Sequence, residues 1–382
     1  MKKIAFIAEY IAPPDRPRTG GLDALTYNLA KCLSKKYEVH IITSYLDHSE
    51  RTEVRDNLTV HRVGLKRKEI QRGDFLKRLM YNRAVESKLL SLEPDLVNAV
   101  GFVSFNGAYK AAKRLNIPVI ATVLEIWQGD WISNVGFFTG LAGEILERIY
   151  LKRNYDRYIA ISRFTGKKME EKLKIPPEKI SIVYCGVDLD DINSVKTYQK
   201  YPRPTIITVC RLVEYKRVQD IIHAIALVKS VIPDINLKII GDGPYRPALE
   251  NLVFEKKLIG NVEFCGKISK NEDLIATLKQ SHVFVLGSTV EGFGMVIIEA
   301  MASGIPFIAA DIPAIREITD GGSGGFLVTP CSPPEIAEDI KKLISYPELY
   351  AEKQEEGVRL VKRYDWANIC RTLDDVIKEL IK

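Results

Sequence analysis

The feature that most constrains the fold is an alternation of short β-branched runs with helical segments, which begins once near the start of the chain and again near its middle. Helical periodicity separates several of the apolar runs in the first half, for instance at Leu22–Leu33 and Phe75–Leu92. Because parallel strands need long crossover connections, this alternation predicts a parallel sheet covered by helices. The predicted strands of this first sheet are Ile4–Ala8, Val39–Thr43, Leu96–Ala99, Val119–Val123, Tyr158–Ile161 and Ile180–Val183.

The pattern restarts after a polar segment, residues 188–204, which ends in a proline and is typical of a linker. A chain of 382 residues also exceeds one ordinary domain. We therefore predict two doubly wound α/β domains, residues 1–190 and 204–364, followed by a helix over 365–382. Ligands of such sheets bind beyond the carboxyl ends of the strands, so we expect a site in a cleft between the domains. The strands predicted for the second sheet are Thr205–Val209, Leu237–Ile240, Val262–Phe264, Val283–Leu286 and Phe307–Ala309.

Composition and cysteine spacing exclude several classes of protein. A content of 46% hydrophobic and 27% charged residues is typical of soluble globular proteins. No apolar run approaches the roughly 18 residues of a transmembrane helix, and the run after Met1 stops at Glu9, which favours a first strand over a signal peptide. The cysteines fit neither a zinc site nor a disulfide framework, so we expect reduced thiols in a cytoplasmic protein. They are Cys32, Cys185, Cys210, Cys265, Cys331 and Cys370.

The net charge of +6 is unevenly distributed. Residues 1–200 hold 33 lysines and arginines against 24 acidic residues, whereas the rest of the chain holds 22 against 25. A solvated helix face and loop explains this excess, and a surface that contacts anionic lipid or a phosphorylated acceptor is the alternative. A nucleic-acid partner is disfavoured because no recognition motif accompanies the charge. Part of the excess lies in one cluster, Arg62, Lys66, Arg67, Lys68, Arg72, Lys77, Arg78 and Arg83.

The segment from Glu291 to Gly304 is the most informative about function. A Gly-rich turn, Glu291–Gly294, follows the predicted strand Val283–Leu286 and leads into a helix that contains Glu299. Such a turn presents backbone N–H groups at a helix N-terminus, where the dipole amounts to roughly +0.5 charge and favours an anion. The two carboxylates would repel a bare phosphate but would bind sugar hydroxyls. The segment therefore predicts a ligand that is part phosphate and part sugar.

Two cations, Arg211 and Lys216, follow the first strand of the predicted second domain. A planar guanidinium and a point charge together suit a diphosphate, whereas a salt bridge with Glu214 is the alternative for either cation alone. The tight turn Gly241–Pro244 ends the next strand and is a candidate wall of a nucleotide pocket. The Phe264–Ile268 segment ends the strand after that, where Gly266 would let the main chain approach a planar base.

A further pair of glycines, Gly20 and Gly21, follows the first strand and opens the helix from Leu22. This is either a turn that approaches a phosphate or substrate, or a plain strand-to-helix turn. The Gly-x-Gly-x-x-Gly fingerprint of dinucleotide enzymes is absent from this turn, which disfavours a nicotinamide cofactor.

The motif set of Arg211 with Lys216, Gly241–Pro244 and Glu291–Glu299 resembles the retaining glycosyltransferases of family 4, in group 1 of the glycosyl transferases. The resemblance extends over most of the chain and includes Gly20–Gly21, Ile161–Ser162, Gly186–Asp188 and the Trp366 segment. It implies the GT-B fold, in which two Rossmann-like domains face each other across a cleft. It also implies that the last helix crosses back and packs on the first domain.

The resemblance also assigns roles to individual residues. Glu299 would bind the nucleotide ribose, Glu291 would contact the donor sugar, and the loop at Ile268 would meet the base. Arg211 and Lys216 would hold the diphosphate, and with Glu291 they form the predicted catalytic set. The predicted donor-binding residues are Gly20, Gly21, Gly241, Ile268, Phe293, Gly294, Met295, Val296 and Glu299.

The first domain departs from the family pattern. Leu124 stands where the family often has a histidine near the donor sugar, and Cys185 and Cys210 replace an asparagine and a glycine. Glu125, with Trp127 and Trp131 close by in the sequence, is a candidate for part of the missing role on the acceptor or sugar side. Simple packing is the alternative for this aromatic loop.

The resulting expectation is a retaining hexosyltransferase of glycan biosynthesis. It would move a sugar from a nucleoside-diphosphate donor to a hydroxyl of a sugar, phosphorylated or lipid-linked acceptor, and would be cytoplasmic or peripheral at an anionic membrane. No metal or cofactor is expected, because Arg211, Lys216 and a helix N-terminus would compensate the leaving charge and no Asp-x-Asp pair suited to Mg²⁺ lies beside Arg211, Lys216 or the Glu291–Gly294 turn. The alternatives are an epimerase or phosphorylase of the same fold, a non-catalytic binding subunit, and a nicotinamide oxidoreductase.

Overall fold

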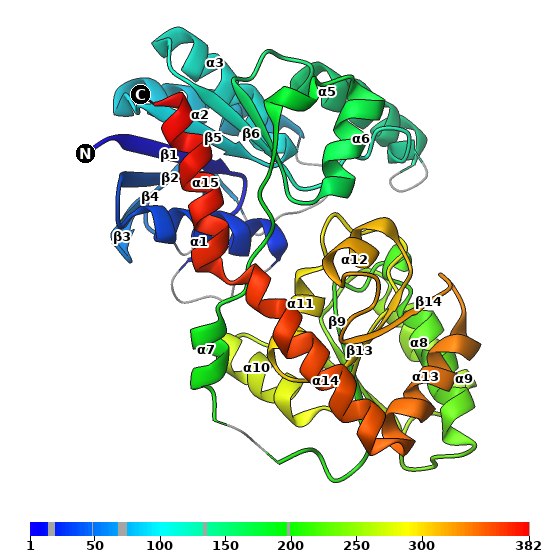
Figure 1. The fold of residues 1–382 in the computed structure, drawn as a ribbon. Coiled ribbons are helices and arrows are strands. Elements are labelled where there is room, and N and C mark those ends of the chain that lie inside the picture. The colour runs from blue at the N-terminus through cyan, green and yellow to red at the C-terminus, as the bar shows by residue number, and fades with distance from the viewer. Residues whose placement is uncertain (14–19, 48, 68–74, 133–135, 197–198, 382) are drawn as a thin grey trace. The chain divides into compact units, whose positions relative to one another are not determined.

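The computed structural model describes residues 1–13, 20–47, 49–67, 75–132, 136–196 and 199–381. The chain forms two compact units (Figure 1). The first unit comprises Met1–Cys185 together with Trp366–Lys382, and the second comprises Gly186–Asp365. Among the described residues, no helix combines the length and apolar character that crossing a membrane requires.

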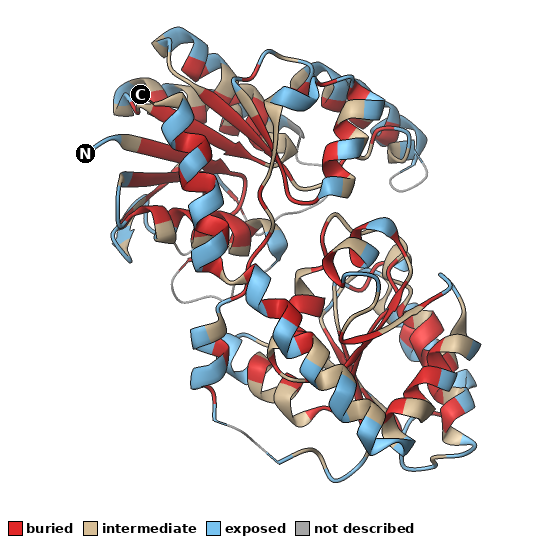
Figure 2. Ribbon diagram, in the orientation of Figure 1, coloured by how far each residue is buried: buried red, intermediate tan, exposed pale blue. Residues whose placement is uncertain are grey.

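The first unit contains a sheet with the strand order β3-β4-β2-β1-β5-β6-β7-β8, which is parallel except for the β3–β4 pair. Apolar runs such as Val119–Val123 are buried throughout, as expected for strands covered on both faces (Figure 2). The strands are β1 (Lys3–Ala8), β2 (Glu38–Leu46), β3 (Thr52–Arg55), β4 (Leu58–Arg67), β5 (Leu96–Val100), β6 (Val119–Val123), β7 (Arg157–Ala160) and β8 (Ile180–Ile182). The helices are α1 (Gly21–Leu33), α2 (Phe75–Leu92), α3 (Phe105–Leu115), α5 (Phe137–Leu151), α6 (Arg163–Leu173) and α15 (Trp366–Leu380), with short 3₁₀ turns η1 (Phe102–Ser104) and η2 (Pro177–Lys179).

The hairpin β3–β4 was not predicted, and it changes the interpretation of the basic cluster. Asp56 and Asn57 join its strands with φ of 49° and 60°, the left-handed values of a tight hairpin turn. Arg62 and Arg67 lie on β4 and are buried, so the prediction of a cationic surface is wrong for these two residues. Each guanidinium is paired with a carboxylate, Arg62 with Glu53 at 3.0 Å and Arg67 with Glu9 at 3.1 Å. Lys68 and Arg72 of the cluster lie outside the described residues.

The second unit contains a fully parallel sheet with the strand order β11-β10-β9-β12-β13-β14. Its strands are β9 (Thr205–Val209), β10 (Asn236–Ile240), β11 (Val262–Gly266), β12 (Val283–Leu286), β13 (Phe307–Ala310) and β14 (Gly325–Val328). Its helices are α7 (Leu189–Ser194), α8 (Val218–Lys229), α9 (Arg246–Glu255), α10 (Asn271–Gln280), α11 (Met295–Ala302), α12 (Pro313–Ile318), α13 (Pro333–Ser345) and α14 (Pro347–Val361), with η3 (Glu214–Lys216) and η4 (Lys362–Tyr364).

Helix α7 forms inside the segment that was predicted as a linker. Its first turn is capped by the Asp188 side chain, which accepts a hydrogen bond from the backbone N–H of Asp191 at 2.9 Å. A carboxylate at this position also interacts favourably with the helix dipole. The polar composition of residues 188–204 therefore reflects, in part, a capped surface helix.

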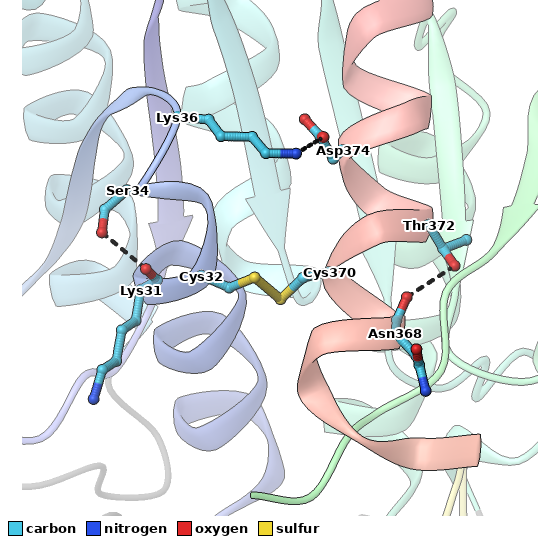
Figure 3. Close-up of a disulfide and its surroundings, with 8 residues drawn as sticks. All are labelled: Lys31, Cys32, Ser34, Lys36, Asn368, Cys370, Thr372 and Asp374. Carbon is cyan, nitrogen blue, oxygen red and sulfur yellow. Dashed lines mark hydrogen bonds and ion pairs between the residues drawn. A yellow bond between two sulfur atoms is a disulfide. The ribbon is translucent and has the colours of Figure 1, made fainter. Parts of the chain in front are cut away.

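The C-terminal helix α15 is fastened to helix α1 of the same unit (Figure 3). A disulfide joins Cys32 to Cys370, and Asp374 accepts hydrogen bonds from Lys36 Nζ at 2.5 Å and Tyr37 Oη at 2.8 Å. The expectation that all cysteines are reduced thiols is therefore wrong for this pair. The two cysteines are 338 residues apart, so no local cysteine spacing could predict that they pair. Cys185, Cys210, Cys265 and Cys331 are free.

Candidate functional site

The second unit brings Lys216 and Glu291 into direct contact. Lys216 follows β9 and Glu291 follows β12, and these are neighbouring parallel strands whose carboxyl ends lie at one edge of the sheet. The Lys216 Nζ atom donates to Glu291 Oε1 at 2.6 Å, and the two side chains are only 16% and 13% exposed. Arg211, by contrast, is exposed and donates to the Tyr215 hydroxyl at 2.8 Å.

The pairing with Glu291 also governs the charge of Lys216. Desolvation alone would lower the pKa of the Lys216 ammonium, but the adjacent Glu291 carboxylate outweighs it, and the pKa lies above its ordinary value. Lys216 is therefore a fixed, largely desolvated cation. Such a charge interacts strongly with a ligand anion because little water screens it.

Main-chain contacts hold the loop that carries Arg211. The backbone N–H of Cys210 donates to Ile240 O and that of Leu212 donates to Asp242 O, each at 3.0 Å. Gly241, at φ 130°, lies so close to this loop that a Cβ atom there would be 1.9 Å from the Cys210 carbonyl oxygen. A glycine is thus required at position 241, and its observed role is to let two loops pack main chain against main chain.

A second set of backbone contacts joins the Lys216 turn to the loop that carries Glu291. The backbone N–H of Thr289 donates to Tyr215 O at 3.0 Å. Tyr215 and Lys216 belong to the same 3₁₀ turn, η3, so this bond holds the two loops in register. The main-chain hydrogen bond therefore helps to fix the relative positions of Lys216 and Glu291.

Helix α11 begins at Met295, and Gly294 is its N-cap residue with φ 99°. The left-handed conformation of Gly294 favours glycine, and a Cβ atom there would lie 2.6 Å from Ile315 Cδ1, so the Ile315 side chain would have to shift. Phe293 is buried with its ring 5.7 Å from that of Tyr364, which anchors the turn. The first N–H groups of any α-helix lack partners within the helix, so those of Met295 and Val296 are suited to bind an anion.

Glu299 lies in the second turn of α11 and is partly buried. Burial raises the pKa of its carboxyl to about 7. Among the described residues, no group is hydrogen-bonded to this carboxyl, so its desolvation is uncompensated in the ligand-free protein. Hydroxyl groups that donate to it would stabilise the ionised form.

Ile268 lies just beyond β11 and is partly buried. The same strand ends in Gly266, whose carbonyl oxygen accepts a hydrogen bond from Gly241 N at 2.8 Å. Backbone hydrogen bonds thus join the segment after β9 to the segment after β10, and the segment after β10 to the end of β11. The structure places Arg211, Gly241 and Ile268 on these adjacent segments.

The remaining predicted residues belong to the first unit. Gly20, at φ 141°, is the N-cap of α1, and both Gly20 and Gly21 are exposed. Glu125 follows β6 and is partly buried. That Gly20 and Gly21 bind the donor, and that Glu125 acts on the acceptor or sugar side, stays a prediction.

Glu147 is a residue that the sequence reasoning missed, and it orders the aromatic loop. This buried carboxylate of α5 accepts hydrogen bonds from the Trp127 backbone N–H at 3.2 Å and from Trp131 Nε1 at 3.1 Å. Desolvation raises the pKa of Glu147. The spacing of Gly140, Gly143 and Glu147, which places them on one face of a helix, is the signal that could have identified a packed face. Both tryptophans therefore have a packing role.

Comparison with known proteins gives matches along both halves of the chain. The family described as Glycosyltransferase Family 4 matches residues 19–191, and the family described as Glycosyl transferases group 1 matches residues 191–359. An uncharacterized glycosyltransferase of Methanocaldococcus jannaschii is 27% identical over 368 residues, which are 95% of this chain and 96% of the relative. The alpha-D-kanosaminyltransferase of Streptomyces kanamyceticus is 28% identical over 202 residues, 50% of this chain and 52% of the relative.

Solved structures with the same fold cover the whole chain. Sucrose-phosphate synthase from Thermosynechococcus elongatus has a TM-score of 0.86 at 19% identity, with 100% of this chain and 99% of that chain covered. Anabaena HepE in complex with UDP-glucose has a TM-score of 0.79 at 19% identity, with 100% of both chains covered. These likenesses identify the GT-B fold. With both family models matched in succession over residues 19–359, the chain belongs to the glycosyltransferases of group 1 and family 4.

Proposed function

We propose that this glycosyltransferase moves a hexosyl residue from a nucleoside-diphosphate sugar to a hydroxyl of a sugar or lipid-linked acceptor, with retention of the anomeric configuration. The observation that carries the proposal is the desolvated Lys216–Glu291 pair, which joins the loops that follow two neighbouring strands. The relatives support the class of donor, since HepE has been crystallised with UDP-glucose.

Each part of the donor has a chemically matched group in the second unit. The Glu299 carboxylate would accept hydrogen bonds from the ribose hydroxyls, and Glu291 would contact the sugar. The N-terminus of α11 and the cations Arg211 and Lys216 would bind the diphosphate. Arg211 is well suited to this role because its observed partner, the Tyr215 hydroxyl, is neutral and leaves the guanidinium charge available for the donor.

The transfer step requires these groups to stabilise a departing anion. The bond between the anomeric carbon and the diphosphate oxygen breaks, and its electron pair leaves with the diphosphate. The acceptor oxygen bonds to the same carbon on the same face, and its proton passes to an oxygen of the departing diphosphate. Arg211, Lys216 and the α11 N-terminus stabilise the growing negative charge, and in this proposal no metal or cofactor is needed. We place the enzyme in the cytoplasm, with an acceptor at the membrane surface; the Cys32–Cys370 disulfide would then be an exception to the reduced thiols usual in that compartment.

A thermal-shift screen against UDP-, GDP- and ADP-sugars tests donor binding. A donor at about 100 times its dissociation constant should stabilise the protein by roughly 2.7 kcal/mol. Glu299→Gln should reduce the shift, whereas Glu352→Gln, the same change at an exposed position of α14, should retain it in full. The absence of a shift with any nucleotide sugar, or an equal shift in both variants, would contradict the assignment.

Measuring the release of nucleoside diphosphate then distinguishes an enzyme from a non-catalytic binding protein. Slow hydrolysis of the bound donor, in which water replaces the acceptor, should appear in the wild type and fall at least tenfold in Lys216→Ala. Binding without any release, both alone and with candidate acceptors, would favour the non-catalytic alternative.

A further inference from the structure

Helix α5 (Phe137–Leu151) has the reverse of the usual arrangement of a surface helix. Its buried face consists of Gly140, Gly143, Glu147 and Leu151. Its exposed face carries Phe137, Phe138, Leu141, Ile145 and Ile149, with exposed fractions from 43% to 86% (Figure 2). An ordinary surface helix buries its apolar side chains and exposes its polar ones.

The buried face explains why the apolar side chains point outward. A Cβ atom at Gly140 would lie 2.5 Å from Ile132 Cα, and one at Gly143 would lie 2.5 Å from the Trp131 ring. The helix therefore packs by its glycines directly on the loop before it, where no large side chain fits. The apolar side chains at positions 137, 141, 145 and 149 recur every four residues and form one stripe on the opposite side.

The charges on this exposed face all have the same sign. Arg148 and Lys152 lie within the arc of the stripe and are exposed. The helix's two carboxylates are engaged elsewhere: Glu147 is buried, and Glu144 accepts the Gly129 N–H at 2.7 Å. Neither Arg148 nor Lys152 is ion-paired with a carboxylate among the described residues. The face thus combines a row of apolar side chains with uncompensated cations.

We propose that the exposed face of α5, defined by Phe137, Phe138, Leu141, Ile145 and Ile149 with Arg148 and Lys152, docks on an anionic lipid bilayer. An apolar stripe with cations and without exposed carboxylates is the pattern of a helix that lies in the membrane interface. The phenyl and aliphatic side chains enter the boundary between headgroups and acyl chains. The two cations meet the negative headgroups, each contributing about fivefold to the partition coefficient, from about 1 kcal/mol per charge.

The charge pattern favours a bilayer over a second copy of the chain. A two-fold contact through this face would bring Arg148 and Lys152 near their own copies, and like charges at an apolar contact oppose association. An anionic surface neutralises both. This surface is also distinct from the basic cluster, because the described members of that cluster lie on β4 and α2.

The docking proposal does not depend on the identity of the donor. Vesicle binding is measured without any nucleotide sugar, and donor binding is measured without vesicles. The docking proposal and the proposed function can therefore be contradicted independently of each other. If both hold, the exposed face of α5 would keep the enzyme at the surface where a lipid-linked acceptor is found.

A tryptophan scan locates the membrane contact. Phe138→Trp and Phe254→Trp place the same reporter at two exposed phenylalanines, 86% and 72% exposed, on α5 and on α9 of the second unit. Vesicles of phosphatidylcholine with about one third phosphatidylglycerol should shift the emission of the Phe138→Trp variant to the blue, beyond the wild-type change. The emission of the Phe254→Trp variant should change no more than that of the wild type. Equal shifts in both variants would overturn the assignment to α5.

Co-sedimentation with the same vesicles measures affinity. Phe138→Glu should lower the partition coefficient at least tenfold, whereas Phe254→Glu, with the same change in charge and size, should leave it unchanged. Lys152→Gln should lower it about fivefold at low salt and have a smaller effect at high salt. Circular dichroism confirms that each variant is folded, and light scattering reports the oligomeric state.

Three further outcomes would overturn the proposal. They are absence of binding to anionic vesicles at low salt, equal binding to vesicles of phosphatidylcholine alone, and a dimer in solution that Phe138→Glu dissociates. The last outcome would assign the exposed face of α5 to a second copy of the chain.

Discussion

Protonation of Glu299 should make donor binding depend on pH in the neutral range. Its pKa of about 7 means that the carboxyl is about half ionised at pH 7 and about one-tenth ionised at pH 6. If the ionised form binds the ribose, the apparent dissociation constant rises by about twofold at pH 7 and about elevenfold at pH 6, relative to full ionisation. The loss between pH 8 and pH 6 is then about tenfold, or about 1.4 kcal/mol.

The sign of the accompanying stability change follows from the same shift. A raised pKa means that the folded, ligand-free protein holds this proton more tightly than the unfolded chain does. The contribution of Glu299 to stability is therefore fully present below the ordinary pKa of 4.5 and is lost as the pH rises through about 7. Donor binding relieves that loss, so the thermal shift caused by the donor should be larger at pH 8 than at pH 6.

Isothermal titration calorimetry with an intact nucleoside-diphosphate sugar is the suitable assay, because the diphosphate diester has no group that titrates near neutrality. Glu299→Gln should bind the donor more weakly, with an affinity that is flat between pH 6 and pH 8. A wild-type affinity that is independent of pH, or a tenfold dependence that survives in Glu299→Gln, would refute the assignment of this carboxylate.

The other predictions concern the framework and the chemistry of the site. Lys216→Ala should lower turnover at saturating donor tenfold or more, since it removes at least about 1.4 kcal/mol of transition-state stabilisation and leaves Glu291 without its partner; full activity would show that this cation does not act on the diphosphate. Gly241→Ala should lower stability by on the order of 1–3 kcal/mol in urea unfolding, because its Cβ atom would overlap a carbonyl oxygen 1.9 Å away; a change below about 0.5 kcal/mol would contradict the observed main-chain contact. Thiol titration of the unfolded, unreduced protein should leave Cys32 and Cys370 unreactive, and replacing both by serine should cost about 2–4 kcal/mol; reaction of both thiols would disprove the bond.

The sequence predicted best where strands are buried on both faces. Strands β6, β9 and β12 have the predicted residues at both ends, because a short run rich in β-branched and apolar residues is typical of a buried parallel strand. The edge hairpin β3–β4 was missed because its strands mix charged and apolar residues. Arg62 and Arg67 suggested a charged surface, and the partners that make their burial tolerable, the Glu53 and Glu9 carboxylates and the Ser44 hydroxyl, lie on other segments.

The candidate site shows the same division between local pattern and remote partner. The residue types and their places after strands were visible in the sequence, as was the Gly-rich turn that precedes α11. The partner of Lys216 could not be identified from the sequence, because Glu291 is 75 positions away and Glu214 is closer in sequence. The disulfide and the orienting role of Glu147 likewise depend on contacts that the fold creates, and no spacing within one segment encodes them.

The proposed transfer is best tested by measuring release of nucleoside diphosphate from a panel of nucleotide sugars in excess EDTA, with wild type and Lys216→Ala compared. The proposed mechanism predicts release by the wild type that excess EDTA does not reduce, because Arg211, Lys216 and the α11 N-terminus compensate the charge of the leaving group. It also predicts at least a tenfold loss of release in the variant. Complete loss of wild-type release in EDTA that Mg²⁺ restores, or equal release by the two proteins, would contradict it.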